Sequence, residues 1–107
     1  MDIRYENEEL EAFIKYGLAT KNPYKRWKSN KQLMVSLQET VRILEIVDNC
    51  GELQLYRRLN YEKLKYERQG QSSVRVGYKS KFRLIFIECD EGVLIKIIEL
   101  SEHYGDK

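Results

Sequence analysis

Residues 82–100 read FRLIFIECDEGVLIKIIEL, and this stretch decides the fold. The nearly continuous apolar run over residues 82–87 predicts a central strand, and the isoleucine-rich run over 93–100 predicts a second strand. The Asp-Glu-Gly sequence at residues 90–92 is typical of a hairpin turn. The stretch therefore predicts two neighbouring antiparallel strands in the middle of a sheet.

Two further strands are predicted outside this hairpin. Apolar and polar residues alternate over 74–78, and Lys79-Ser80 then offers a turn into the central strand. Near the N-terminus, Ile3 and Tyr5 flank Arg4 in a short alternating segment. These patterns predict a meander of three strands in the second half of the chain and one strand at its start.

The first half of the chain has helical spacing instead. Asn7 is a suitable N-cap for a first helix, and Gly17 weakens its last turn before Asn22-Pro23 breaks the pattern. A second helix is predicted from Ser29 or Asn30 to a C-terminal cap at Gly51. Its apolar stripe consists of Leu33, Leu37, Val41 and Leu44.

The predicted fold class is therefore α+β with the element order β-α-α-β-β-β. Two helices pack on one face of a small, mainly antiparallel sheet. We expect a single domain over residues 1–107, since a chain of this length has enough surface for one modest core. Residues 52–71 lack clear periodicity, and a segment of this length is often functional or contains a short helix or strand.

Composition excludes several classes of function. The apolar runs are too short to cross a membrane, and the N-terminus lacks a signal-peptide pattern, so we expect a cytoplasmic protein without a membrane partner. Cys50, Cys89 and a single histidine cannot form a zinc site of standard spacing. The six glycines form no phosphate-binding loop. We therefore expect no metal and no cofactor.

Charge is strongly segregated along the chain. The net charge is only +2, yet residues 21–36 contain five basic and no acidic residues, and residues 55–83 contain nine basic residues against two acids. This concentration favours a polyanionic partner, because binding to phosphates is mainly electrostatic. The alternative is a solvated basic face without a partner.

Three basic side chains can be tested for a common location. If residues 90–92 form a three-residue turn, Arg83 lies opposite Glu99, on the face that His103 continues. A three-residue turn at 79–81 adds Arg75 to that face, whereas a two-residue turn places Arg75 on the other one. The same face is expected to contain Ile85, Ile87, Ile95 and Ile97.

A group of two arginines and a histidine suits the cleavage of an RNA phosphodiester bond. Arginines stabilise the charge of the phosphorane, and a histidine with a pKa near neutrality transfers protons. Tyr104 can stack on a base or donate a proton. The alternatives are that the arginine forms an ion pair with a neighbour such as Glu99, and that the histidine is a surface residue without a catalytic role.

Four short motifs follow one another in a characteristic order: EKLK at 62–65, SVRV at 73–76, FRLIF at 82–86 and IELSEHYG at 98–105. This order resembles the RelE/ParE toxin superfamily, in particular its HigB-like plasmid-maintenance killer branch. Two positions depart from that pattern: Tyr66 stands where the family has a glycine, and Phe82 stands where it has a tyrosine.

The resemblance implies a toxin of a type II toxin–antitoxin system, acting as a metal-independent, ribosome-dependent mRNA endoribonuclease. It implies that Arg75 and Arg83 stabilise the phosphate, that Lys65 binds it, and that His103 transfers protons beside Tyr104. More distant basic residues would hold RNA: Lys21, Lys25, Arg26, Lys28, Arg57, Arg58, Lys63, Arg68, Lys79 and Lys81.

The resemblance also implies partners and rival activities. The partners are the ribosome with its mRNA and a cognate antitoxin, often a helix-turn-helix DNA-binding protein. The same superfamily contains ParE-type gyrase inhibitors, which bind a protein target and lack nuclease residues. A third reading is an inactive relative that only binds an antitoxin.

Overall fold

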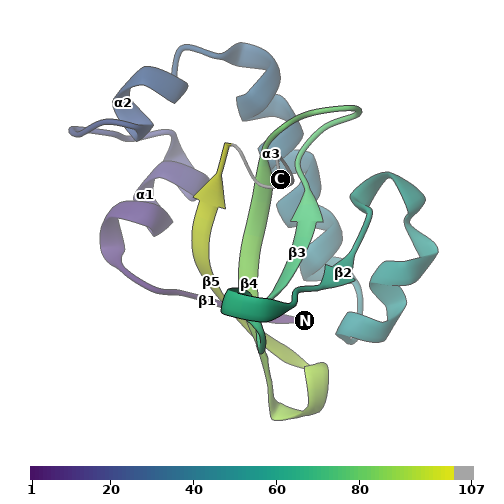
Figure 1. Ribbon diagram of the computed structural model, residues 1–107. Coiled ribbons are helices and arrows are strands. Elements are labelled where there is room, and N and C mark those ends of the chain that lie inside the picture. The colour runs from purple at the N-terminus through teal and green to yellow at the C-terminus, as the bar shows by residue number, and fades with distance from the viewer. Residues whose placement is uncertain (103–107) are drawn as a thin grey trace.

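Five strands form one mixed sheet in the order β1-β5-β4-β3-β2 (Figure 1). The computed structural model describes residues 1–102. The strands are β1 (Asp2–Tyr5), β2 (Glu62–Lys63), β3 (Ser72–Arg75), β4 (Arg83–Cys89) and β5 (Leu94–Ser101). Only the β1–β5 pair is parallel, and the other pairs are antiparallel. The predicted α+β class is confirmed, and β4 and β5 are the central hairpin that the sequence predicts.

Two main helices cover one face of this sheet, α1 (Glu8–Tyr16) and α3 (Lys31–Ile46). Asn7 caps α1 by accepting a hydrogen bond from the backbone N–H of Leu10 at 2.8 Å. Asn30 caps α3 in the same way through the N–H of Leu33 at 3.0 Å. A helix of one turn, α2 (Tyr24–Trp27), lies between them. Neither α1 nor α3 is long and apolar enough to cross a membrane, and the same holds for every helix of residues 1–102.

The predicted end of α3 is wrong. The helix ends at Ile46, and Val47 takes an extended backbone conformation that places its side chain in the core, where it is 2% exposed. Gly51, the expected cap, instead lies in a 3₁₀ helix, η1 (Cys50–Leu55). Burial of Val47 therefore overrides the glycine signal four residues later.

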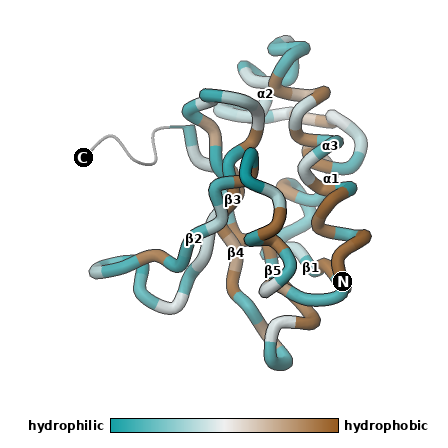
Figure 2. Tube along the Cα trace, turned by 90° about the vertical axis from the view of Figure 1, so that its right-hand side faces the viewer, coloured by the Kyte–Doolittle hydropathy of each residue, from teal (hydrophilic) through white to brown (hydrophobic). Residues whose placement is uncertain are grey.

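The main core fills the space between these helices and the sheet. Leu10 and Phe13 of α1 and Leu37 and Leu44 of α3 are completely buried there. No helix of this size in residues 1–102 lies on the opposite side of the sheet, which we call the outer face. Figure 2 shows the helices on one side of the sheet and other segments of the chain on the other side.

The segment that connects α3 to β3 contains four short elements. They are η1, η2 (Arg57–Leu59), β2 and η3 (Tyr66–Arg68), so the expectation of short elements within residues 52–71 is confirmed. We call residues 60–71 the arm. The arm runs along β3 through β2 and then lies on the outer side of the sheet (Figure 2).

A β-bulge between Ile85 and Phe86 changes which residues share a face. Cys89 pairs with Leu94, so the connection has four residues rather than the expected three, and Ile95 and Ile97 belong to the main core. Beyond the bulge the register shifts by one residue, and Ile85 pairs with Glu99. The prediction that Ile95 and Ile97 share a face with Arg83 is therefore wrong.

Candidate functional site

Two rows of paired residues cross the outer face. The first row joins Glu62, Ser73, Ile85 and Glu99 from four neighbouring strands. In the second row Arg75 pairs with Arg83, and Arg83 pairs with Ser101. Directly paired residues share a face, so Arg75 and Arg83 lie on one face, which is the first of the two alternatives that the sequence left open.

The turn that was expected to produce this arrangement is different. Val76 donates a backbone hydrogen bond to Phe82 at 2.9 Å, and residues 77–81 form a five-residue loop. Gly77 therefore does not pair with Arg83, as it would after a three-residue turn at 79–81. An odd number of loop residues still preserves the alternation of side chains, which is why both arginines share a face.

Arg83 is buried in this site and is 5% exposed. Its Nε donates to the Oγ of Ser73 at 2.9 Å, and its Nη2 donates to the backbone carbonyl of Asn60 at 2.6 Å. A buried guanidinium needs such acceptors, because an unsatisfied buried charge is costly. Arg83 therefore joins the first residue of the arm to β3 and β4.

Arg75 has a different environment although it is the direct partner of Arg83. It is only partly buried, and its side chain makes no hydrogen bond or ion pair with another of residues 1–102. It also lines a cavity of about 200 Å³ together with residues of α3 and η2. Because its side chain is less buried than that of Arg83 and is not engaged by another described residue, Arg75 is the arginine of the pair that a bound anion can reach.

The arm places two further basic residues over the outer face. Lys65 is exposed and precedes η3. Arg68 forms an ion pair with Glu99 of β5 at 2.8 Å, and its other amine donates to the side chain of Gln71 at 2.8 Å. Leu64 of the arm and Ile85 of β4 are both buried outside the main core. The arm therefore packs on the outer side of the sheet as an ordered element.

The expected basic residues near α2 and in the loop 77–81 converge at the end of β5. Arg26 and Lys81 each lie 3.4 Å from a carboxylate oxygen of Glu102. Aromatic contacts hold α2 in this place, because the ring of Trp27 lies 5.3 Å from that of Phe82. Two basic segments that are far apart in sequence thus meet at Glu102.

The remaining expected RNA-binding residues are distributed over several surfaces. Lys21, Lys25, Lys28, Lys63 and Lys79 are exposed, as are Arg57 and Arg58. Arg58 lies 3.9 Å from Glu39 of α3, on the helix side of β3. The structure therefore does not gather all ten residues into one patch.

One acidic residue of the site was missed in the sequence analysis. Glu62 of β2 is exposed and pairs with Ser73, the residue that accepts a hydrogen bond from Arg83. Alternation of side chains between the two faces of a strand would have indicated it. However, β2 has only two residues, which are too few for a periodic pattern within residues 52–71. A carboxylate on this face can accept a proton near the two arginines.

His103 and Tyr104, the expected acid–base residues, lie outside the described residues. Within residues 1–102 no group of three or more histidine, cysteine or acidic side chains is arranged to hold a metal ion. The described site consequently offers cationic and carboxylate groups, a combination suited to anion binding and proton transfer.

A separate polar cluster lies on the helix side of the sheet. Tyr61 and Ser72 both donate hydrogen bonds to the same oxygen of Glu88, the latter at 2.7 Å. Burial raises the pKa of the nearby Cys50 thiol to about 12, and the charge of Glu88 acts in the same direction. Burial is also the main reason why the pKa of Tyr61 is raised. Cys50 is therefore a protonated core residue and not a nucleophile at neutral pH.

Comparison with known proteins identifies the fold. No protein-family model and no curated protein sequence matches the chain. A solved YoeB/ParE toxin from Agrobacterium tumefaciens is similar, with a TM-score of 0.59 and 14% identity over 97% of this chain and 100% of that one.

Two solved structures from Staphylococcus aureus are also similar, a YoeB dimer and a heterotetrameric complex of the toxin YoeB with the antitoxin YefM. Each has a TM-score of 0.51 and 20% identity, over 97% of this chain and 98% of the other. The chain thus has the fold of these YoeB and YoeB/ParE toxins. The HigB-like branch stays a prediction.

Proposed function

We propose that this chain is the toxin of a type II toxin–antitoxin pair and that it cuts mRNA on the ribosome without a metal ion. Two observations support the proposal. The fold is similar to that of YoeB and ParE toxins over nearly the whole chain. The observation that carries the nuclease activity is the direct pairing of Arg75 with Arg83 on the outer face, in the row next to Glu62.

The proposed reaction is attack of a ribose 2′-hydroxyl on the adjacent phosphate. The hydroxyl loses its proton to a base, the phosphorane gathers negative charge, and the leaving 5′-oxygen takes up a proton. Glu62 is a candidate for the base, because it lies on the face of the arginines, and His103 is the candidate for the acid. Arg75 would contact the phosphorane, where cationic donors lower the barrier most.

Arg83 contributes to this site by position as well as by charge. Its hydrogen bonds to Ser73 and to the carbonyl of Asn60 fix the start of the arm, which carries Lys65. Lys65 would then bind a phosphate of the same RNA strand. A fixed geometry matters because the reacting atoms must be held close together and in line.

We propose a cognate antitoxin as the protein partner. The support is the Staphylococcus aureus YoeB, which forms a heterotetrameric complex with its antitoxin YefM. Residues around α2 and the loop 77–81 are the proposed contacts with ribosomal RNA, since Lys21, Lys25 and Lys79 are exposed there.

The alternative is a ParE-type inhibitor that binds gyrase. One observation favours it: Arg83 is almost completely buried and already engaged by Ser73 and Asn60, as a structural arginine would be. In that case the outer face would have no nuclease activity, and the toxic effect would depend on contact with a protein.

The test uses purified protein, ribosomes and a defined mRNA with an empty A site. New RNA ends are mapped for the wild type and for His103→Ala. We expect a cut in the A-site codon that the variant loses. If the folded wild type leaves the mRNA intact but inhibits supercoiling by gyrase, the nuclease proposal is wrong and the ParE-type alternative takes its place.

A further inference from the structure

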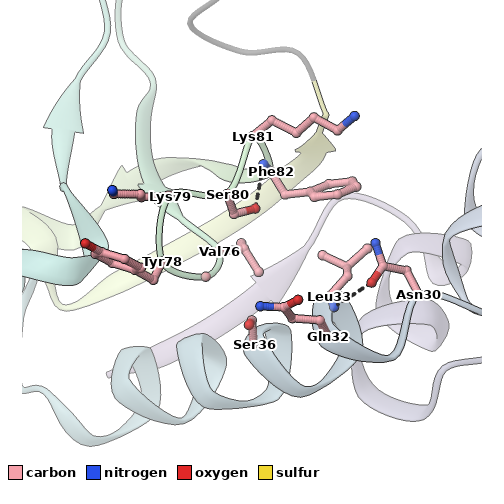
Figure 3. A pocket seen from close by; sticks show the side chains of 11 residues that line it. Asn30, Gln32, Leu33, Ser36, Val76, Tyr78, Lys79, Ser80, Lys81 and Phe82 are labelled. Carbon is pink, nitrogen blue, oxygen red and sulfur yellow. Dashed lines mark hydrogen bonds between the residues drawn. The ribbon is translucent and has the colours of Figure 1, made fainter.

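A groove runs between the N-terminal half of α3 and the loop 77–81. Its larger part is a cavity of about 260 Å³, shown in Figure 3, and the smaller part is the cavity that Arg75 lines. Gln32, Ser36, Gly77 and Tyr78 line both parts. The two cavities are therefore neighbouring sections of one groove, which we call the loop groove.

The larger cavity combines an apolar floor with polar walls. Leu33, Val76 and Phe82 are buried apolar residues that line it. Gln32 and Ser36 face it from α3 (Figure 3), and within residues 1–102 the side-chain amide of Gln32 makes no hydrogen bond. A nucleobase has the matching chemistry, with flat apolar faces and an edge of donors and acceptors.

The volume of this cavity is also informative. Pockets for drug-sized ligands usually measure about 300–1,000 Å³. At about 260 Å³ the cavity lies just below that range, so it suits a single planar group better than a large cofactor. One base of an extended strand meets this condition.

Aromatic and cationic groups surround the opening. Tyr78 is 79% exposed, and the Nζ of Lys79 lies 5.4 Å from the centre of its ring. Lys81 lines the cavity on the other side of the loop (Figure 3). An exposed aromatic ring beside a lysine is a surface on which a base stacks while its phosphate is neutralised.

The loop is held close to α3 by the backbone of Gly77. Its φ is +98°, and a Cβ at this position would lie 3.0 Å from the Oγ of Ser36. Glycine therefore permits a close approach that shapes both sections of the groove. The shape depends on the fold of the loop and not on flexible side chains alone.

From these observations we infer that the loop groove binds one nucleotide of single-stranded RNA, with Tyr78 stacking on the base and Lys79 contacting the phosphate. The inference rests on the proposed function, since it adds a subsite to the same substrate. The RNA strand would continue into the smaller cavity, which Arg75 lines from the end of β3. The groove would thus hold a base on the helix side of β3, at the end of the strand whose Arg75 side chain lies on the outer face.

The test is a titration of ¹⁵N-labelled protein with a hexaribonucleotide in which every 2′-hydroxyl is methylated, so that it cannot be cut. Amide signals of Gln32, Ser36 and Tyr78 should shift. Tyr78→Ala should weaken the affinity about tenfold, as expected for the loss of one stacked base. Tyr16→Ala is the matched control, because Tyr16 is 71% exposed on α1 outside the groove, and it should bind as tightly as the wild type.

Two results would overturn the inference. One is RNA binding that shifts no groove residue or is equally strong in Tyr78→Ala. The other is a hexaglutamate peptide that shifts the same amides and displaces the RNA at equal concentration, which would make the groove a site for an acidic protein.

The cleavage assay on ribosomes separates this inference from the proposed function. If the wild type cleaves mRNA but Tyr78→Ala binds RNA as tightly as the wild type, only the inference of a nucleotide site in the loop groove is wrong. If RNA binds in the loop groove but the wild type does not cleave mRNA, only the proposal of nuclease activity is wrong.

Discussion

Arg75 and Arg83 face each other directly across β3 and β4, yet they differ in burial and in bonding. Like charges in directly opposed positions destabilise a sheet. Arg83 compensates for this through its bonds to Ser73 and to the carbonyl of Asn60, whereas Arg75 remains accessible. The two arginines therefore have different roles: Arg83 holds the arm in place, and Arg75 can contact a phosphate.

Arg83→Ala should reduce the free energy of unfolding by about 1–3 kcal/mol, because it leaves the buried hydroxyl of Ser73 without its donor. Arg83→Lys should restore only part of this loss, since an ammonium cannot reproduce the planar fork of a guanidinium. Urea denaturation followed by circular dichroism measures both values. A fully stable Arg83→Ala variant would show that these bonds contribute nothing to the fold.

Removal of the Arg68–Glu99 ion pair should loosen the arm without unfolding the domain. Both side chains are partly exposed, so Glu99→Gln should change global stability by less than about 1 kcal/mol. Hydrogen exchange should nevertheless accelerate at the amide of Leu64, which donates to the carbonyl of Gln71 within the arm. Unchanged exchange at this amide would mean that other contacts hold the arm.

Gly77 and Gly70 form a matched pair for measuring the crowding at the loop groove. Both have positive φ angles, +98° and +93°, but a Cβ at Gly70 would meet no atom within 4 Å. Gly70→Ala should therefore cost only backbone strain, on the order of 1 kcal/mol, and Gly77→Ala should cost more because of Ser36. Equal losses in thermal stability would contradict a tight contact between the loop and α3.

Stability should fall at alkaline pH, partly because of Cys50. Below pH 9 the thiol is protonated in both states, so its contribution is fully present. Between pH 9 and about 12 the unfolded chain loses this proton while the folded protein keeps it, because burial raises the pKa in the folded state. The free energy of unfolding should decrease by at most about 1.4 kcal/mol per pH unit from this group.

Cys50→Ala is the control for this pH dependence. This variant should be less stable than the wild type. The slope of its free energy of unfolding against pH between 9 and 11 should also be shallower than that of the wild type. Urea denaturation at several pH values gives both slopes. Identical slopes would assign the alkaline loss to other groups, of which Tyr61 is the first candidate because its pKa is also raised.

The main elements could be predicted because their signals are local. Asn7 caps the first helix as expected, the second main helix starts next to Asn30, one of the two expected positions, and the apolar run over 82–87 lies in the central strand β4 apart from its first residue. The shared face of Arg75 and Arg83 also follows from sequence, provided that the loop has an odd number of residues. The loop 77–81 meets this condition with five residues instead of three.

Other features depend on tertiary contacts and left no clear pattern. The bulge between Ile85 and Phe86 reverses the expected face of Ile95 and Ile97, and nothing in this apolar run indicates where a register shift occurs. The burial of Arg83 depends on a carbonyl of Asn60, which is 23 residues away. The position of Glu62 follows from a strand of two residues, which is too short for a periodic signal.

The most direct test of the central claim compares the wild type with Arg75→Ala and Arg42→Ala in single-turnover cleavage of mRNA on ribosomes. Arg42 is an exposed arginine of α3 that serves as the matched control for charge. We predict that Arg75→Ala cuts at least about 100-fold more slowly while its stability changes by less than about 1 kcal/mol, and that Arg42→Ala cuts as the wild type does. Cleavage by a folded Arg75→Ala variant at the wild-type rate would contradict the account, because the accessible arginine of the pair would then have no part in the reaction.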